Sequence, residues 1–180
     1  MLGAIEKRRS CRKFDDREVE DEKIMEICKA GLLAPSAMHN ENVEIIVIKD
    51  PLTKKRLSSL NARIASMPEG KDPFYGASCI LLVISKKSRT AIYDGSVCME
   101  NMLLEATDLH LGAVWIHRAK EEIESPEGRE ILSSLGLDLT QYEGIGHVAL
   151  GYPLQQAEPK TVDMKRIHIM DQERKKPCSK

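Results

Sequence analysis

The sequence lacks an excess of charge of either sign, and this counts against a large class of partners. Its 180 residues contain 27 Lys and Arg and 28 Asp and Glu, which gives a formal net charge of −1. A chain without a net positive field has little to hold a long polyanion. We therefore expect no nucleic acid as its main partner.

Long hydrophobic runs are also missing. The longest purely apolar stretch is "CILLVI", residues 79–84, whereas a membrane-spanning helix needs about 20 predominantly apolar residues. The opening "MLGAIEKRRS" reaches charged residues before a signal-like apolar region can form. The sequence therefore predicts a cytoplasmic protein with no membrane partner.

Patterns that bind metals or form disulfides are absent too. The five cysteines are odd in number, scattered, and contain no Cys-x-x-Cys pair, so they indicate neither a disulfide framework nor a zinc site. We expect small buried apolar residues and one thiol in the tail, Cys178. The histidines at positions 39, 110, 147 and 168 have no metal-ligand spacing, and no metal is expected.

The remaining composition is that of one globular domain. The chain is long enough to bury a core, and 42% apolar with 31% charged residues is an ordinary balance. Hydrophobic periodicity, β-branched runs and capping residues predict its elements. In order, these are helices over 2–9 and 21–33, a strand over 43–49, a helix from 51 capped by Asp50, an irregular segment over 61–76, a strand over 79–85, a central buried helix over 94–111, a strand over 113–116, a helix over 125–136 capped by Ser125, and a strand over 144–152.

A glycine-rich dinucleotide fingerprint is absent as well. The alternation of predicted helices and strands, taken alone, favours a parallel α/β sheet. In such folds a glycine-rich turn follows a strand and opens a helix. "GIGHVALG", residues 144–151, has two early glycines but lies inside a strand pattern with no helix after it. We expect no dinucleotide site there.

The C-terminal tail differs from the rest of the chain. Residues 153–180 are polar, have few apolar anchors and cannot fold alone. Such a segment must lie on another surface, and a second subunit is one candidate. We therefore divide the chain into a core, 1–152, and a C-terminal arm, 153–180.

One basic stretch stands out against the neutral background. "KRRSCRK", residues 7–13, places five cationic side chains in seven positions. Arginine forks and a serine hydroxyl can converge on one phosphate if Arg8, Arg9, Ser10 and Arg12 lie where a helix runs into an extended turn. The plainer alternative is a solvated cationic helix end, which the helix dipole favours without any ligand. The residues alone leave both interpretations open.

Four segments together carry a resemblance to a known family. They are "RRSCRKF" (8–14), "AGLLAPSA" (30–37), "YDGSVCMENMLLEATDLHLGAVWIHRAKEEIE" (93–124) and "YEGIGHVALGYP" (142–153). In this order and spacing they resemble the FMN-dependent nitroreductase family, from about residue 4 to residue 155. The long middle segment is the most specific of the four.

The resemblance implies a fold, an assembly and a reaction. The fold is α+β, an α/β/α sandwich with a mainly antiparallel central sheet, in an intertwined homodimer whose C-terminal arms cross to the partner. Two FMN molecules lie at the subunit interface, and the chemistry is that of the flavin. The implied activity is the reduction of nitroaromatic, quinone or similar small acceptors by NADH or NADPH, with ping-pong hydride transfer.

Site residues follow from the same resemblance, position by position. Arg8, Arg9 and Ser10 match a clamp on the phosphate and ribityl chain, and Arg12 matches a cation near the pyrimidine edge. Pro35, Ser36, Ala37 and His39 match a loop that covers the flavin from the other subunit. The backbone of Ile116, His117 and Arg118 matches the segment beside flavin N5, and no catalytic side chain is required. The His117 ring has two open roles, a donor to flavin or substrate or a helix cap.

The sequence also departs from the family pattern. His39 replaces a common Asn, and Glu41, Asn42 and Val43 replace a Gln-Pro-Trp run. Val162 stands where a late arginine usually helps to hold the phosphate, which leaves Lys160, or Lys165 and Arg166, as substitutes. These changes keep a second hypothesis open, a catalytically degenerate member that binds flavin or another ligand.

Overall fold

The fold is built on an antiparallel sheet whose last strand lies near its centre. The computed structural model describes residues 2–155, 158 and 160–170. The strands in this part of the chain are β1 (Val43–Ile48), β2 (Cys79–Lys86), β3 (Gly112–Ile116) and β4 (Tyr142–Gly151). They lie in the order β1-β2-β4-β3, and each neighbouring pair is antiparallel.

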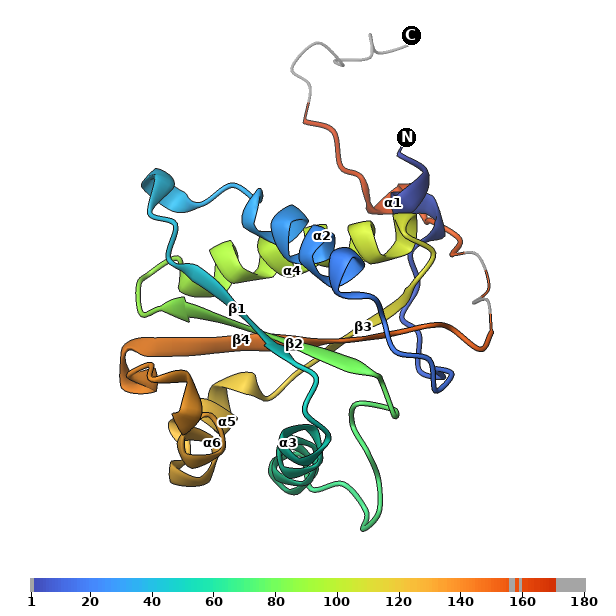
Figure 1. The fold of residues 1–180 in the computed structure, drawn as a ribbon. Helices are drawn as coiled ribbons and strands as arrows, with labels where there is room; N and C mark the ends of the chain where they lie inside the picture. Colours follow the sequence, from blue (N-terminus) through green and yellow to red (C-terminus); the bar gives the residue numbers. More distant parts are fainter. Residues whose placement is uncertain (1, 156–157, 159, 171–180) are drawn as a thin grey trace, which may run out of the picture.

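Helices cover both faces of the sheet (Figure 1). On one face lie α1 (Gly3–Lys7), α2 (Asp21–Leu32) and α4 (Ala91–Asp108), and on the other lie α3 (Pro51–Ile64), α5 (Ala119–Glu124) and α6 (Pro126–Ile131). Short 3₁₀ turns cover Ala37–His39, Ser133–Leu135, Leu139–Gln141 and Met164–Arg166. The α/β/α sandwich with an antiparallel sheet is thus confirmed.

The parallel sheet that alternation favours is wrong, and Figure 1 shows a reason. A parallel crossover needs a helix that carries the chain back to the edge where the first strand began. Here α3, between β1 and β2, is seen nearly along its axis while both strands run across the view. The helix therefore does not return the chain, and β2 enters the sheet antiparallel to β1.

The core has two layers, one on each face of the sheet. Residues 79–85 of β2 are all buried, because both faces of this strand are covered by helices. The long apolar character of α4 has the same origin, since α4 packs on the sheet and on α2. At Gly31 the two helices approach so closely that a Cβ atom would lie 2.7 Å from Met102 Cγ. Within the described residues, no helix is long and apolar enough to cross a membrane.

Element boundaries differ from the predictions in a few places. The helix α3 runs to Ile64, so the irregular segment begins later than residue 61. The central helix covers Ala91–Asp108 instead of 94–111, because His110 adopts a left-handed φ of 60° that ends it. The predicted caps hold, with Thr53 N–H donating to Asp50 and Gly128 N–H donating to Ser125. Sequence reasoning missed α5, which is short and begins without a side-chain cap.

Three of the cysteines are core residues, as expected. Cys28, Cys79 and Cys98 are buried, and burial raises their thiol pKa values to about 11, about 12 and about 12. Cys11 is half-buried, which is a departure from the prediction. Cys178 lies outside the described residues.

Candidate functional site

The basic stretch runs along the free edge of the sheet. Ser10 pairs with Ala113 of β3 in a parallel bridge, and the Cys11 N–H donates to the Ala113 carbonyl at 3.0 Å. Phe14 forms an antiparallel bridge with Pro153. These contacts hold the segment that follows α1 in an extended conformation. The side chains of Arg9 and Arg12 are therefore presented from a backbone that is fixed on the sheet.

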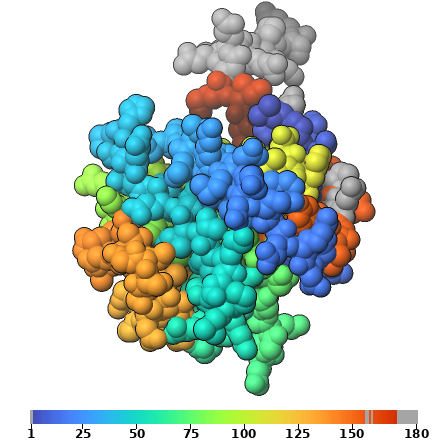
Figure 2. Space-filling model, in the orientation of Figure 1, coloured from blue at the N-terminus to red at the C-terminus, as the bar shows by residue number. Residues whose placement is uncertain are grey.

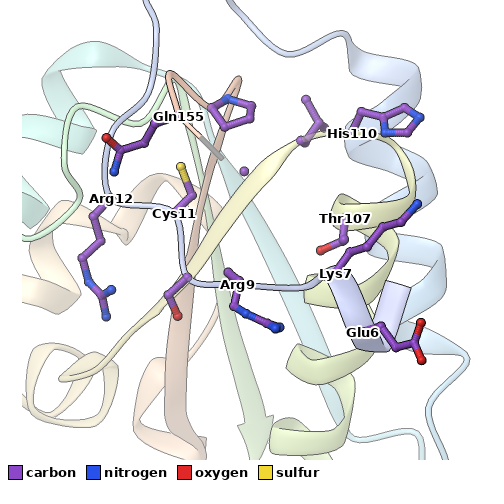
Figure 3. Close-up of a pocket in the computed structure, with 12 residues that line it drawn as sticks. Glu6, Lys7, Arg9, Cys11, Arg12, Thr107, His110 and Gln155 are labelled. Atoms are coloured by element: carbon purple, nitrogen blue, oxygen red, sulfur yellow. The ribbon is translucent and has the colours of Figure 1, made fainter. Parts of the chain in front are cut away.

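This segment borders the first cavity, with a volume of about 570 Å³. Its charged lining residues are mainly cationic, with Lys7, Arg9 and Arg12 against one carboxylate, Glu6. Figure 3 shows the three cations on one N-terminal segment, with Thr107 of α4 and His110 just after this helix on the side of Lys7. The remaining lining residues are Ser10, Cys11, Leu111, Gly112, Pro153 and Gln155. The cavity can accept an anionic group.

The arginines of this stretch are held in different ways. The Arg9 Nε donates to the carbonyl of Glu158 at 3.0 Å, and one terminal nitrogen donates to the carbonyl of Arg8. The Arg8 guanidinium lies 3.8 Å from a Glu100 carboxylate oxygen on α4 and does not line the cavity. Arg12 has no ion pair with any described residue and is exposed to solvent. Arg9 and Arg12 are the arginines placed to meet a ligand there.

A second cavity, of about 560 Å³, lies where α2 ends. Pro35, Ser36, His39 and Glu41 line it, together with the buried carboxylate of Asp94 on α4. The other lining residues are Gly31, Leu32, Leu33, Ala34, Val43 and Cys98. This cavity therefore collects most of the loop for which the resemblance predicted a flavin contact.

The loop that forms this cavity is pinned and strained. The Ala37 N–H donates to Asp94 Oδ1 at 3.2 Å, and the Thr90 hydroxyl donates to Asp94 Oδ2 at 2.9 Å. The residues Met38, His39 and Glu41 have left-handed φ values of 54°, 54° and 44°. Each such residue costs about 1–2 kcal/mol, and strain of this kind is concentrated at functional sites.

The third group of predicted residues follows β3. Ile116 is buried, His117 is exposed, and Arg118 has a left-handed φ of 86° as the residue before α5. The His117 carbonyl accepts a hydrogen bond of 2.8 Å from the side-chain amide of Asn61 on α3. The His117 ring does not cap α5, because residue 118 is the N-cap and has no side-chain cap bond.

The two cavities of one chain are separate. They share no lining residue, although α4 contributes Asp94 to the second cavity and Thr107 to the first. At 1.5 Å per residue these two positions lie about 20 Å apart along the helix. The arm residues Lys160, Val162, Lys165 and Arg166 are exposed and line neither cavity.

Sequence reasoning missed several residues of these sites. Lys7 belongs to the quoted basic stretch, so its charge was a signal that could have been used. Asp94 carried a weaker signal, a carboxylate in the first turn of a largely buried helix. Thr107, His110 and Gln155 carried none, because only the folded chain brings them beside Arg9.

Comparison with known proteins gives a consistent assignment. The profile described as "Nitroreductase family" matches residues 5–152. A protein of Archaeoglobus fulgidus, named provisionally as an NADH dehydrogenase/NAD(P)H nitroreductase, is 30% identical over 161 residues, which is 87% of each chain.

Solved structures agree in fold. The crystal structure of a nitroreductase with bound FMN from Bacteroides fragilis has a TM-score of 0.84 at 29% identity and covers 94% of this chain and 98% of that one. An FMN-dependent nitroreductase from Clostridium difficile R20291 has a TM-score of 0.79 at 28% identity and covers 95% and 99%. Because the profile spans nearly the whole described core and the sandwich is shared, the chain belongs to the nitroreductase family.

Proposed function

We propose that this protein is an FMN-dependent NAD(P)H oxidoreductase that reduces nitroaromatic, quinone or similar small acceptors. The observation that carries the proposal is the cationic first cavity beside a hydroxyl donor, Ser10. A phosphate is best held by arginine forks and additional hydrogen-bond donors. The relatives support the identity of the ligand, since the Bacteroides fragilis structure contains FMN and the Archaeoglobus fulgidus protein is named for NAD(P)H.

The residues around the first cavity fit the phosphate end of FMN. Arg9 and Ser10 would hold the phosphate and ribityl chain, whereas Arg8 and Lys160 lie outside the cavity lining. Arg12 would lie near the pyrimidine edge, where a cation stabilises the negative charge of a reduced ring. FMN supplies the hydride and electron transfer. The protein orients it and holds donors at its edge.

We propose a homodimer in which each site takes one cavity from each subunit. The distance along α4 supports this arrangement, since Asp94 and Thr107 of one chain lie too far apart to meet at one ring. Exposed apolar side chains beside the second cavity also support it, because an exposed apolar patch commonly marks an interface. They are Leu32, Leu33, Met38, Tyr93 and Val97, and Met38 is 85% exposed. Pro35, Ser36, Ala37 and His39 would then face the flavin of the partner.

The absorption spectrum of the purified protein tests the proposal directly. We expect a yellow protein with two visible flavin bands and one FMN per chain after denaturing release. Addition of NADH or NADPH without oxygen should bleach the visible bands. A colourless protein that does not take up added FMN would contradict the proposal. A yellow protein whose bands survive both donors would support the degenerate flavin-binding alternative.

Donor and acceptor are expected to use one pocket in turn. The core contains no separate dinucleotide fingerprint, and both substrates must reach the same ring edge. Initial rates with NAD(P)H and menadione should therefore give parallel lines in double-reciprocal plots, as for other two-step transfers. A nitroaromatic acceptor is the matched second substrate. Intersecting lines with both acceptors would mean that donor and acceptor are bound together.

A further inference from the structure

Three polar side chains are buried in the otherwise apolar layer between the sheet and α3 and α5. Asn61 on α3 is 2% exposed, and Glu122 on α5 and His147 on β4 are both 0% exposed. The neighbours on this face are apolar, among them Leu57, Ile116 and Ile123. Burial of polar and charged groups is costly unless they are hydrogen-bonded. These three residues therefore need an explanation beyond packing.

The three side chains form one connected chain of hydrogen bonds. His147 Nε2 lies 2.8 Å from Glu122 Oε2, and Asn61 Nδ2 donates to Glu122 Oε1. The same Asn61 amide donates to the backbone carbonyl of His117 at 2.8 Å. Of the elements that carry them, α3 and α5 lie on the same side of the sheet in Figure 1, and β4 is a strand of that sheet. The network thus connects the core to the segment that follows β3.

Within the described residues, this carbonyl is the one backbone group that the three side chains bind. His147 even leaves its Nδ1 without a described partner, and its other contact is edge-on to the Phe74 ring at 5.2 Å. An unpaired buried nitrogen reduces stability. The one donor from the network to the backbone, the Asn61 amide, binds the 117–118 peptide.

The bound carbonyl fixes the direction of the next N–H group. In a trans peptide the carbonyl of His117 and the N–H of Arg118 point in opposite directions. Because the carbonyl points to Asn61 in the core, the N–H of Arg118 points away from it. This N–H has no acceptor among the described residues. The left-handed φ of 86° at Arg118 is a second constraint on the same peptide.

The start of α5 is also held from the strand side. A Cβ atom at Gly144 of β4 would lie 2.3 Å from the backbone carbonyl carbon of Ala119. Glycine is therefore required where β4 supports this backbone. The backbone is thus held by the buried network at His117 and packed against β4 at Ala119.

We infer that Asn61, Glu122 and His147 are positioning residues that aim the Arg118 N–H at the flavin ring. The inference rests on the proposed function and on the placement of residues 116–118 beside flavin N5, which the family resemblance implies. A fixed N–H donor at N5 stabilises the oxidised ring over the reduced ring, because N5 accepts a hydrogen bond when oxidised and carries a hydrogen when reduced. Loss of the clamp should thus raise the reduction potential and leave the phosphate contacts unchanged.

The test compares Asn61→Leu with Leu57→Ala in the full-length protein. Both positions are buried on α3, but Leu57 has no part in the network, so it controls for lost stability. We expect Asn61→Leu to weaken the binding of oxidised FMN about tenfold more than that of reduced FMN, which raises the two-electron midpoint potential by about 30 mV. The midpoint potential of the Leu57→Ala variant should equal that of the wild-type protein. Equal potentials in both variants would overturn the inference.

A second pair of variants separates hydrogen bonding from shape. Glu122→Gln keeps an acceptor for Asn61 and a donor for His147, whereas Glu122→Leu keeps neither. The Gln variant should retain the wild-type potential and the Leu variant should shift in the same direction as Asn61→Leu. If the Gln and Leu variants have the same potential, the clamp is not made by these hydrogen bonds.

Trypsin provides a readout that needs no flavin. Cleavage after Arg118 requires the 116–120 backbone to leave its clamped conformation, so Asn61→Leu should be cleaved there at least about fivefold faster than Leu57→Ala. A wild-type protein that binds no FMN contradicts the proposed function. In that case the cleavage rates of the two variants still test whether Asn61 holds the 116–120 backbone. Equal cleavage rates in the two variants would show that Asn61 does not hold the segment.

Discussion

A chain that ends after Gln155 is expected to be monomeric and to lose FMN. The described arm, residues 160–170, is exposed over its whole length. It nevertheless carries five apolar side chains, Val162, Met164, Ile167, Ile169 and Met170. Figure 1 shows this segment beside α1, from which it rises away from the body, and Figure 2 shows its last part (dark red) outside the main surface. Burial of apolar surface contributes about 25 cal/mol per Å², which this arm gains only against a second subunit.

Truncation after Gln155 leaves the contacts of the cationic segment with the core intact. The bridge between Phe14 and Pro153 and the 3.0 Å hydrogen bond from Leu154 N–H to the Lys13 carbonyl both remain. Light scattering should give about twice the 20.2 kDa chain mass for the full-length protein and one chain mass for the truncated one. A full-length monomer that still holds FMN would contradict the shared site.

Single substitutions provide the matched control for truncation. Ile169→Asp places a charge on the arm and should weaken the dimer. Leu52→Asp alters a similarly exposed apolar residue on α3, in the other layer, and should leave the dimer unchanged. A dimer that tolerates Ile169→Asp and the truncation alike would mean that the arm takes no part in assembly.

The second large effect is expected at Arg9. Arg9 lines the first cavity, and a hydrogen bond to a charged group is worth about 1.5–3 kcal/mol, or roughly one to two decades in affinity. Arg9→Ala should therefore weaken the binding of FMN by about tenfold to hundredfold. It should weaken the binding of riboflavin far less, because riboflavin lacks the phosphate. Fluorescence titration of the apoprotein measures both constants.

Two other arginines control the Arg9 experiment. Arg56 forms a surface ion pair of 2.8 Å with Glu130 on the α3 and α6 side, so Arg56→Ala should leave both flavins unaffected. Arg8 lies beside Glu100 and outside the cavity lining, so Arg8→Ala should have a smaller effect than Arg9→Ala. Equal losses of FMN and riboflavin in Arg9→Ala would mean that this side chain supports the fold and not the phosphate.

Local chemistry made much of the fold predictable. Asp50 and Ser125 begin helices because a side-chain oxygen accepts a free N–H of the first turn, and this needs only neighbouring residues. Strand direction is different, since alternation does not say whether a helix such as α3 returns the chain. The antiparallel sheet was therefore expected from the resemblance and not from the pattern.

The site was predictable only where its residues are close in sequence. The basic stretch could be recognised because its charges are adjacent. The buried network could not, since Asn61, Glu122 and His147 lie on three elements that only the folded chain brings together. Each is also an ordinary surface residue type, so neither composition nor periodicity marked it as buried.

The central place of β4 has a consequence for biosynthesis. The strands β2 and β3 have no contact in the sheet until β4, the last strand made, inserts between them. On the ribosome the buried strand β2 must therefore wait for its second partner strand while residues 87–151 are translated. Contacts between residues far apart in sequence form slowly, and exposed strands aggregate. The sheet can be completed only after residue 151 has emerged from the exit tunnel, so β2 needs protection until then.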